Sequence, residues 1–174
     1  MGSQFSFGFW KMSVKFKIRD MLYPRAHIIK EVGIKSGWNV LDFGCGPGGY
    51  ILPVSKIVGD SGKVYALDIN PLAINMVKRL ADNKKLNNVF TIQSDRNTGL
   101  PDQSIDSVLL YDVFHGLNNP EPVLNELHRV LKSGGILSFS DHHMKENEIM
   151  QAFNGSRYFV FQRKGKKTYT FINR

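Results

Sequence analysis

A short apolar run leads directly into a cluster of glycines, and this junction constrains the fold more than any other part of the sequence. Residues 40–43 have the composition of a buried strand, and four glycines follow within six positions, at Gly44, Gly46, Gly48 and Gly49. Glycine permits backbone conformations and close approaches that other residues resist. The segment predicts a strand, a tight loop and then a helix, with side chains absent from the loop because a ligand needs the room.

Apolar, β-branched runs alternate with helical patterns from about Asn39 onward. The runs lack strict polar alternation, which is typical of strands that are buried on both faces of a parallel sheet. Strands that alternate with helices in this way indicate an α/β fold, in which helices cover the sheet. The strands are predicted over 40–43, 63–68, 89–93, 105–111 and 136–141.

Capping residues mark the helices between these strands. Asn70 is suited to cap a helix whose first residue is Pro71, because that position needs no N–H donor. A later helix is predicted to begin near Pro120 and to stop at Gly134-Gly135, since glycine favours the left-handed conformation of a helix end. A short helix is predicted over 145–153.

The two ends of the chain differ in character from its middle. Residues 158–162 and 168–172 are aromatic and β-branched, and the basic run 163–167 separates them. This pattern predicts an antiparallel hairpin that closes the sheet. Residues 1–38 combine basic and aromatic side chains, and one or two helices that lean over the carboxyl edge of the sheet are expected there.

Length and composition exclude several classes of protein. A chain of 174 residues fits one ordinary domain, and 42% hydrophobic with 22% charged residues is a globular balance. A single cysteine, Cys45, excludes a disulfide framework. No apolar run approaches the roughly 18 residues of a membrane span, and no signal peptide is visible, so a cytoplasmic protein is expected.

The net charge of +8 is concentrated at the two ends of the chain. Residues 1–40 carry seven basic and two acidic groups, and the last 19 residues carry six basic groups and no acidic one. Basic ends suit RNA, a membrane surface or an anionic substrate, but such charges are more often only solvated. A specific polyanion role is therefore kept as an alternative.

Asp42 bears on the kind of ligand that the glycine loop binds. The spacing Gly44-x-Gly46-x-x-Gly49 also fits the fingerprint of dinucleotide-binding loops. Such a loop directs N–H groups at a pyrophosphate, and a carboxylate two residues before the first glycine is badly placed for that task. Pro47 also removes one N–H from the loop. A carboxylate at this position favours a ligand with a cationic amino acid end.

A series of motifs resembles the class I S-adenosylmethionine (SAM) dependent methyltransferases, closest to the ubiquinone/menaquinone-type branch and the related "methyltransferase domain 11" enzymes. The motifs are, in order, Asp42-x-Gly44-x-Gly46-x-Gly48, Asp68, Ser94-Asp95, 100–115 and 127–135. The match covers roughly residues 36–143. That part is the expected cofactor-binding core of a single domain over 1–174, between an N-terminal cap segment, 1–35, and a helix with the closing hairpin, 144–174.

The resemblance implies a Rossmann-like, doubly wound fold with a mostly parallel seven-stranded sheet, a C-terminal antiparallel hairpin and helices on both faces. In the family, an acidic residue at the end of the second strand holds the ribose hydroxyls, and one after the third strand accepts from the adenine amino group. These stations fall on Asp68 and Asp95. The expected cofactor-binding residues are Asp42, Gly44, Cys45, Gly46, Gly48, Tyr50, Asp68, Ile69, Ser94, Asp95, Arg96 and Asp112.

Structural roles remain open at three of these positions. Asp68 has the alternative of capping the next helix together with Asn70. Asp95 has the alternative of a turn residue, and Arg96 beside it departs from the small residue expected there. Cys45 is interpreted as a small filler of the loop.

Side chains after the fourth and fifth strands are the candidates for catalysis, because ligands of open α/β sheets bind at the carboxyl ends of the strands. They are Asp112, His115, Asp141, His142 and His143. His115 is the predicted general base, since neutral imidazole accepts a proton at physiological pH, and packing beside the cofactor is its alternative role. His142 and His143 are neighbours on an extended strand, expected to point to opposite faces, so no metal site is predicted.

The predicted function is a SAM-dependent methyltransferase that acts on a small molecule. The alternatives are a methyltransferase for RNA or protein, a non-catalytic SAM-binding module and a nicotinamide oxidoreductase. The interval between the fifth strand and the hairpin is short, so the acceptor pocket needs a cover from residues 1–35, a second subunit or a large substrate. A monomer or homodimer is expected, with a small-molecule acceptor favoured over nucleic acid.

Overall fold

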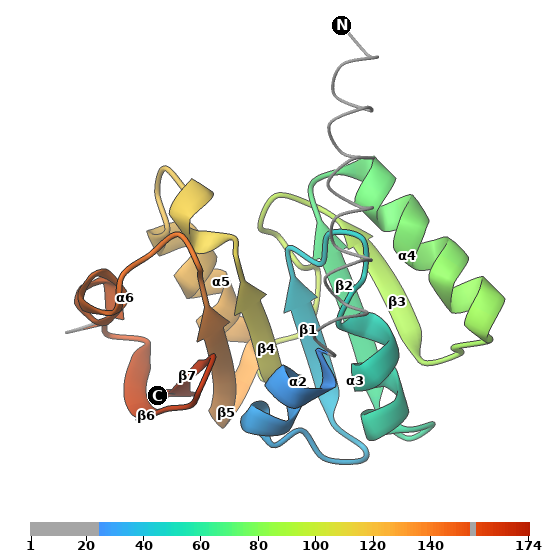
Figure 1. The fold of residues 1–174 in the computed structure, drawn as a ribbon, viewed down its shortest axis with the longest axis horizontal. Coiled ribbons are helices and arrows are strands. Elements are labelled where there is room, and N and C mark those ends of the chain that lie inside the picture. Colours follow the sequence, from blue (N-terminus) through green and yellow to red (C-terminus); the bar gives the residue numbers. More distant parts are fainter. Residues whose placement is uncertain (1–24, 154–155) are drawn as a thin grey trace, which may run out of the picture.

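The structure, a computed structural model, describes residues 25–153 and 156–174. Its strands are β1 (Asn39–Phe43), β2 (Lys63–Asp68), β3 (Val89–Gln93), β4 (Ile105–Tyr111), β5 (Leu131–Ser140), β6 (Phe159–Lys164) and β7 (Tyr169–Asn173). They form one sheet in the order β3-β2-β1-β4-β5-β7-β6 (Figure 1). Strands β1 to β5 are parallel, and β7 runs antiparallel to both β5 and β6. The predicted doubly wound sheet with a C-terminal antiparallel hairpin is confirmed.

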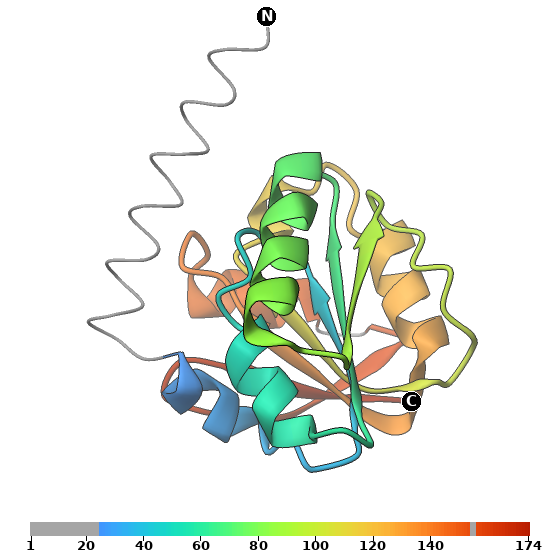
Figure 2. The ribbon, with the colours of Figure 1, turned by 90° about the vertical axis from the view of Figure 1, so that its right-hand side faces the viewer.

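Helices cover both faces of this sheet, as predicted. They are α2 (Ala26–Val32), α3 (Ile51–Val58), α4 (Pro71–Lys84), α5 (Glu121–Val130) and α6 (Glu146–Phe153), with a single 3-10 turn, η1 (Phe114–Gly116). One apolar cluster lies under α2, α3 and α4, and the other lies under α5 and α6. Figure 2 shows α2, α3 and α4 on one side of the sheet and α5 on the other. No helix within the described ranges is long and apolar enough to cross a bilayer, and the cytoplasmic location stays a prediction.

Helix α4 begins where its capping residues predict. The side chain of Asn70 accepts a hydrogen bond of 2.9 Å from the N–H of Leu72, and Pro71 occupies the first helical position. Only two residues therefore separate the end of β2 at Asp68 from the start of the helix. This short connection keeps the start of α4 at the carboxyl edge of the sheet, next to the glycine loop.

The boundary between α5 and β5 differs from the prediction. The helix ends at Val130 instead of continuing to Gly134-Gly135, and β5 already begins at Leu131, which is fully buried. The two glycines lie inside β5, where its register against β4 shifts, and Gly134 has a φ of 74°. The two glycines allow an irregular stretch of the strand. Glycine is as typical of a β-bulge as of a helix end, so the same two residues fit either structure.

Helix α2 is fastened to the turn between β6 and β7. One carboxylate oxygen of Glu31 accepts from the backbone N–H of Thr168 at 3.2 Å and from its hydroxyl at 3.0 Å, and Arg163 donates to the backbone carbonyl of Glu31 at 2.6 Å. Ile29 and Val32 are almost completely buried beneath the helix. Of the predicted N-terminal cap segment, residues 1–24 lie outside the described residues, so α2 is the part whose position is known.

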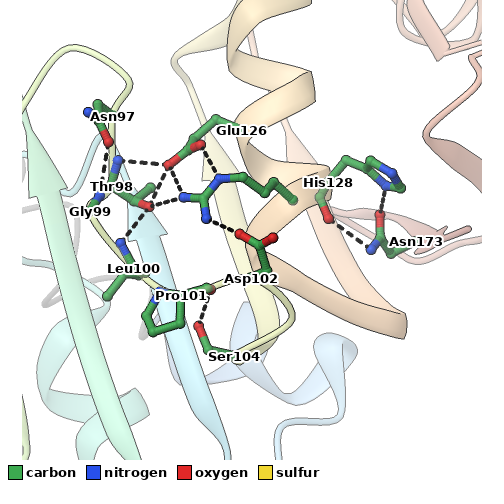
Figure 3. A network of polar contacts seen from close by, with 11 residues as sticks. Asn97, Thr98, Gly99, Leu100, Pro101, Asp102, Ser104, Glu126, His128 and Asn173 are labelled. Carbon is green, nitrogen blue, oxygen red and sulfur yellow. Dashed lines mark hydrogen bonds and ion pairs between the residues drawn. The ribbon is translucent and has the colours of Figure 1, made fainter.

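A polar network holds the connection between β3 and β4 against α5 (Figure 3). Glu126 accepts from the N–H and the hydroxyl of Thr98 at 2.9 and 2.6 Å, and Arg129 donates to both of its oxygens at 2.8 Å. Arg129 also pairs with Asp102. Burial alone would raise the pKa of Glu126, but the hydrogen bonds from Arg129 and Thr98 outweigh it and hold the pKa below its usual value. The loop that follows β3 is thereby fixed at its far end.

Replacing Glu126 tests this network. Because the pKa of Glu126 is lowered in the folded protein, its stabilising contribution is present above its unfolded pKa of about 4.5 and is lost as the pH falls. We expect Glu126→Gln to lower the free energy of unfolding at pH 7 by about 1–3 kcal/mol, with a smaller difference from wild type at pH 3.5. Urea unfolding at the two pH values measures this. Glu148→Gln, at an exposed position on α6, is the control, and a loss of equal size for both variants would contradict the network's role.

Candidate active site

The carboxyl ends of β1 and β4 lie side by side where the strand order of the sheet reverses. Strands β1 to β3 extend from this point in one direction, and β4, β5 and the hairpin extend in the other. Ligands of doubly wound sheets bind at such a reversal. In Figure 1 the arrowheads of β1 and β4 point to this edge, from which the glycine loop and η1 emerge.

The glycine loop is held by backbone hydrogen bonds from its first residues. The N–H groups of Gly44 and Cys45 both donate to the carbonyl of Leu67, at 2.8 and 2.9 Å. The N–H of Gly46 donates to a carboxylate oxygen of Asp68 at 2.8 Å. The end of β2 therefore supports the loop that follows β1. Cys45 is buried, which fits the interpretation of a small filler, and burial raises the pKa of its thiol.

The glycines of the loop have different reasons for lacking a side chain. All three of Gly44, Gly46 and Gly48 have positive φ angles. A Cβ added at Gly44 would overlap the side chain of Val113, and one at Gly48 would lie 3.0 Å from Val77. Of the three, Gly46 alone has no heavy atom of the described residues within 4 Å of an added Cβ. Core packing is therefore a second reason for glycine at Gly44 and Gly48, and the expectation that a ligand needs the room stays a prediction for all three.

Asp42 is a buried carboxylate at the end of β1. It is 3% exposed, and its Oδ2 has no hydrogen-bond partner within the described part of the chain. Burial raises its pKa to about 7, the nearby Arg25 guanidinium opposes this rise, and Asp68 adds to it. An acceptor in this state is stabilised by a donor or a cation that a ligand brings.

Asp68 already makes two backbone contacts. Its second oxygen accepts from the N–H of Asn70 at 2.8 Å, in addition to the bond from Gly46. Asp68 therefore contacts the residue that caps α4, whereas the cap itself is made by Asn70. Each carboxylate oxygen keeps a further lone pair, so the contacts are compatible with hydroxyl binding as well. Ile69 beside it is 67% exposed and presents an apolar surface at the same edge.

The residues predicted to contact adenine lie at the next strand end. The N–H of Ser94 donates to the carbonyl of Asp68 at 3.2 Å, which places the end of β3 beside the end of β2. The hydroxyl of Ser94 accepts from the N–H of Arg96 at 3.3 Å and forms a local turn. Asp95 and Arg96 are exposed in this turn. Their contact with a ligand stays a prediction.

Two aspartate–histidine pairs cross between the ends of β4 and β5. Asp112, after β4, accepts from the N–H and the ring Nδ1 of His142 at 3.0 and 2.6 Å. Asp141, after β5, accepts from the N–H of His115 at 3.0 Å and lies 2.9 Å from its Nδ1. Each strand thus supplies the carboxylate for the histidine that follows the other strand. Asp112 adopts a φ of 55°, a left-handed conformation that suits aspartate better than most residues.

The Asp141–His115 pair is the more buried of the two. The side chain of Asp141 has no exposed surface, whereas that of Asp112 is 33% exposed. Burial would raise the pKa of Asp141, but hydrogen bonds from His115 and from the N–H of His143 lower it overall. A carboxylate only accepts, so Nδ1 of His115 carries the hydrogen and Nε2 is left as the proton acceptor.

The three histidine rings lie against one another. The ring of His143 is 4.2 Å from that of His115 and 3.9 Å from that of His142, measured between ring centres. The expectation that His142 and His143 point to opposite faces is therefore wrong, because β5 ends at Ser140 and both histidines lie in the turn beyond it. Across residues 25–153 and 156–174, no group of three or more potential ligands is arranged to hold a metal ion.

Arg25 is a site residue that the sequence did not single out. It precedes α2, and its guanidinium lies 4.5 Å from the ring centre of Tyr50. Tyr50 in turn meets Tyr111 at the end of β4, with ring centres 4.9 Å apart. Val113 packs against Gly44, so the histidine cluster and the glycine loop belong to one edge of the sheet. No local sequence pattern connects Arg25 with the glycine loop, because long-range packing decides where its side chain lies.

The sheet is doubly wound, and the glycine loop follows β1 where the strand order reverses. This architecture is typical of proteins that bind a nucleotide-like ligand at the carboxyl edge of the sheet. The sequence model of the methyltransferase domain family matches residues 34–172, and the chain belongs to this family.

Known relatives share the core of the chain. It is 30% identical over 129 residues to the ubiquinone/menaquinone biosynthesis C-methyltransferase UbiE of Shewanella sp. (strain W3-18-1), over 73% of this chain and 51% of the relative. It is 28% identical over 127 residues to the demethylmenaquinone methyltransferase of Geobacillus stearothermophilus, over 72% of this chain and 54% of the relative. The chain thus spans about half the length of the curated relatives it matches. A crystal structure of a SAM-dependent methyltransferase from Aquifex aeolicus aligns with a TM-score of 0.79 and 28% identity, covering 92% of this chain and 96% of that one.

The loop residues fit the amino acid end of SAM. The buried Oδ2 of Asp42, unpaired among the described residues, calls for a cationic donor, and Gly46, four residues further along the chain, has open space around it. A pyrophosphate would bring negative charge to the same carboxylate, which is unfavourable in a buried site. The charge at the end of β1 therefore favours SAM over a dinucleotide.

Replacing Asp42 tests whether burial of its ionised carboxylate lowers the stability of the folded protein. Its pKa is about 7 in the folded protein, above the ordinary 3.8, so the fold loses stability as the pH rises between these values. We expect Asp42→Asn to remove this loss and to raise the Tm of the ligand-free protein by about 3 °C or more at pH 8, with less gain at pH 4. Differential scanning calorimetry measures both. Asp60→Asn, at an exposed position, is the control. If the Tm gain of Asp42→Asn over wild type were smaller at pH 8 than at pH 4, the assignment would be contradicted.

Proposed function

We propose that this chain is a SAM-dependent methyltransferase that acts on a small-molecule acceptor. The observation that carries the proposal is the buried carboxylate of Asp42, which has no partner for Oδ2 among the described residues, at the start of the loop that contains the open position at Gly46, in a chain of the methyltransferase domain family. The relatives are named as methyltransferases, which supports methyl transfer, and their names refer to quinones, which supports a small acceptor.

The cofactor, when bound, supplies an electrophilic methyl group on a sulfonium. The task of this chain is to bind and orient it and to exclude water, because alignment of the reacting atoms provides much of the acceleration of such a displacement. Asp42 would hold the amino acid end, and Asp68 with the exposed Ile69 would hold the ribose side. Ser94, Asp95 and Arg96 would follow at the adenine. Cys45, Gly48, Tyr50 and Asp112 complete the predicted cofactor wall.

His115 is the proposed general base on the acceptor side. Asp141 holds its Nδ1, which leaves Nε2 to take a proton from a hydroxyl or an activated carbon of the acceptor. Asp141 is therefore a positioning residue that fixes the orientation of the imidazole. His142 has the same kind of partner in Asp112, but its side chain is 60% exposed, against 36% for His115.

The remaining organisation is part of the same proposal. Residues 36–143 would form the cofactor core and residues 144–174 would close the sheet, while the acceptor pocket needs a cover from the cap segment 1–35, a second subunit or a large substrate. The nucleic-acid alternative gains no support from Arg163 and Lys164 at the end of β6, since Arg163 contacts Glu31 and Lys164 pairs with Glu146. A monomer or a homodimer is compatible with this arrangement.

Filling the open loop position tests cofactor binding. Calorimetry should show that Gly46→Val weakens SAM binding by about 100-fold, because the new side chain enters the open space at Gly46 that the cofactor is proposed to occupy. Gly134→Val is the matched control, since Gly134 also has a positive φ and open space but lies far along β5 from the site. The proposal is supported if both variants lose a similar amount of Tm and only Gly46→Val loses SAM affinity. Unchanged affinity in Gly46→Val would refute the position of the cofactor.

Release of S-adenosylhomocysteine tests catalysis. Wild-type protein is assayed with a panel of hydroxylated aromatic acceptors that includes reduced demethylmenaquinone. On an acceptor that turns over, His115→Gln should lower kcat by about 100-fold or more with an unchanged Kd for SAM, because a positioned base is lost. Asp141→Asn should lower kcat less, and His142→Gln is the comparison from the second pair. A larger loss in His142→Gln would reassign the base, and SAM binding without turnover of any acceptor would favour a non-catalytic module.

A further inference from the structure

The guanidinium of Arg25 lies directly over the glycine loop. Its Cζ is 4.5 Å from the ring centre of Tyr50, and a Cβ added at Gly49 would overlap the guanidinium group. Its charge also opposes the rise that burial causes in the pKa of Asp42. A positive group over the end of the loop therefore interacts with a buried negative group before its start.

Arg25 is held in this place by the rest of the molecule. The helix that it precedes is anchored by Ile29 and Val32 in the core and ends at Gly33, which has a φ of 78°. The carboxylate of Glu31 fastens the same helix to Thr168 in the closing hairpin. A guanidinium on such a support is a positioned group, unlike an arginine on a free surface.

We propose that Arg25 binds the α-carboxylate of SAM while Asp42 takes its α-ammonium group, an inference that rests on the proposed function. The amino acid end of SAM is a zwitterion, and a guanidinium beside a carboxylate presents the complementary pair of charges. The planar guanidinium fork suits a carboxylate because it donates two parallel hydrogen bonds. Arg25 is thus a cofactor-specificity residue from outside the glycine motif.

The contrasting role is that of a counterion or plug for Asp42 alone. In that case Arg25 competes with the cofactor's ammonium group, and its removal tightens the binding of any ligand with that group. The two roles differ in their dependence on the ligand's carboxylate. Decarboxylated SAM, which keeps the sulfonium, the nucleoside and the amine but lacks the carboxylate, separates them.

The experiment is isothermal titration of the full chain with SAM and with decarboxylated SAM. We expect Arg25→Gln to weaken SAM binding by roughly 30-fold and to change the affinity for decarboxylated SAM by less than about threefold. Arg25→Lys should recover part of the loss, because it restores the charge without the planar fork. Lys30→Gln, an exposed cation on the same helix, is the control and should change neither affinity.

The outcomes separate this inference from the proposed function. Equal losses for both ligands, unchanged SAM affinity or tighter binding in Arg25→Gln would overturn the role of Arg25, while wild-type binding of SAM would leave the proposed function in place. A wild-type protein that binds neither ligand would overturn both. A Tm of Arg25→Gln within a few degrees of wild type, measured beside the titrations, ensures that lost affinity reports on the site.

Discussion

The site depends on a carboxylate that the fold buries and whose Oδ2 has no hydrogen-bond partner among residues 25–153 and 156–174. Asp42 is the last residue but one of β1, inside a parallel sheet where an unpaired charge is costly, and its pKa is raised accordingly. The reversal of strand order lies beside the same strand, and the loop that follows the strand has an open position at Gly46. A buried carboxylate of this kind selects a cationic group and disfavours a pyrophosphate. SAM and dinucleotides bind similar glycine loops, and the negative charge of Asp42 favours SAM.

Parts of the chain that are distant in sequence form the walls of this site. The crossed pairs Asp112–His142 and Asp141–His115 tie the ends of β4 and β5 into one platform, and Val113 joins that platform to the glycine loop at Gly44. On the other side, the position of Arg25 depends on α2, which Glu31 fastens to the closing hairpin. The hairpin therefore does more than complete the sheet, because it also supports the cofactor side of the site.

Local rules predicted much of this fold, and long-range packing explains where they failed. Patterns that extend over only a few residues were enough for several elements. Hydrophobic runs predicted the bounds of β2, β3 and β4, and capping chemistry predicted the start of α4 at Asn70. The role of Gly134-Gly135 was misjudged because a glycine pair suits a strand irregularity as well as a helix end. The reason for Gly44 depends on Val113, nearly seventy residues away in the chain, and the stacking of His142 with His143 depends on where β5 ends. Arg25 was missed because no local pattern connects it with Tyr50 or Asp42.

The most direct test of the account is the pKa of the Asp42 carboxyl itself, followed by carbon NMR in the ligand-free protein and in the SAM complex. The account predicts a pKa near 7 without ligand and a marked decrease when SAM is bound, because a cation next to the carboxylate favours its ionised form. An ordinary aspartate pKa in the free protein, or a value that SAM leaves unchanged, would contradict it.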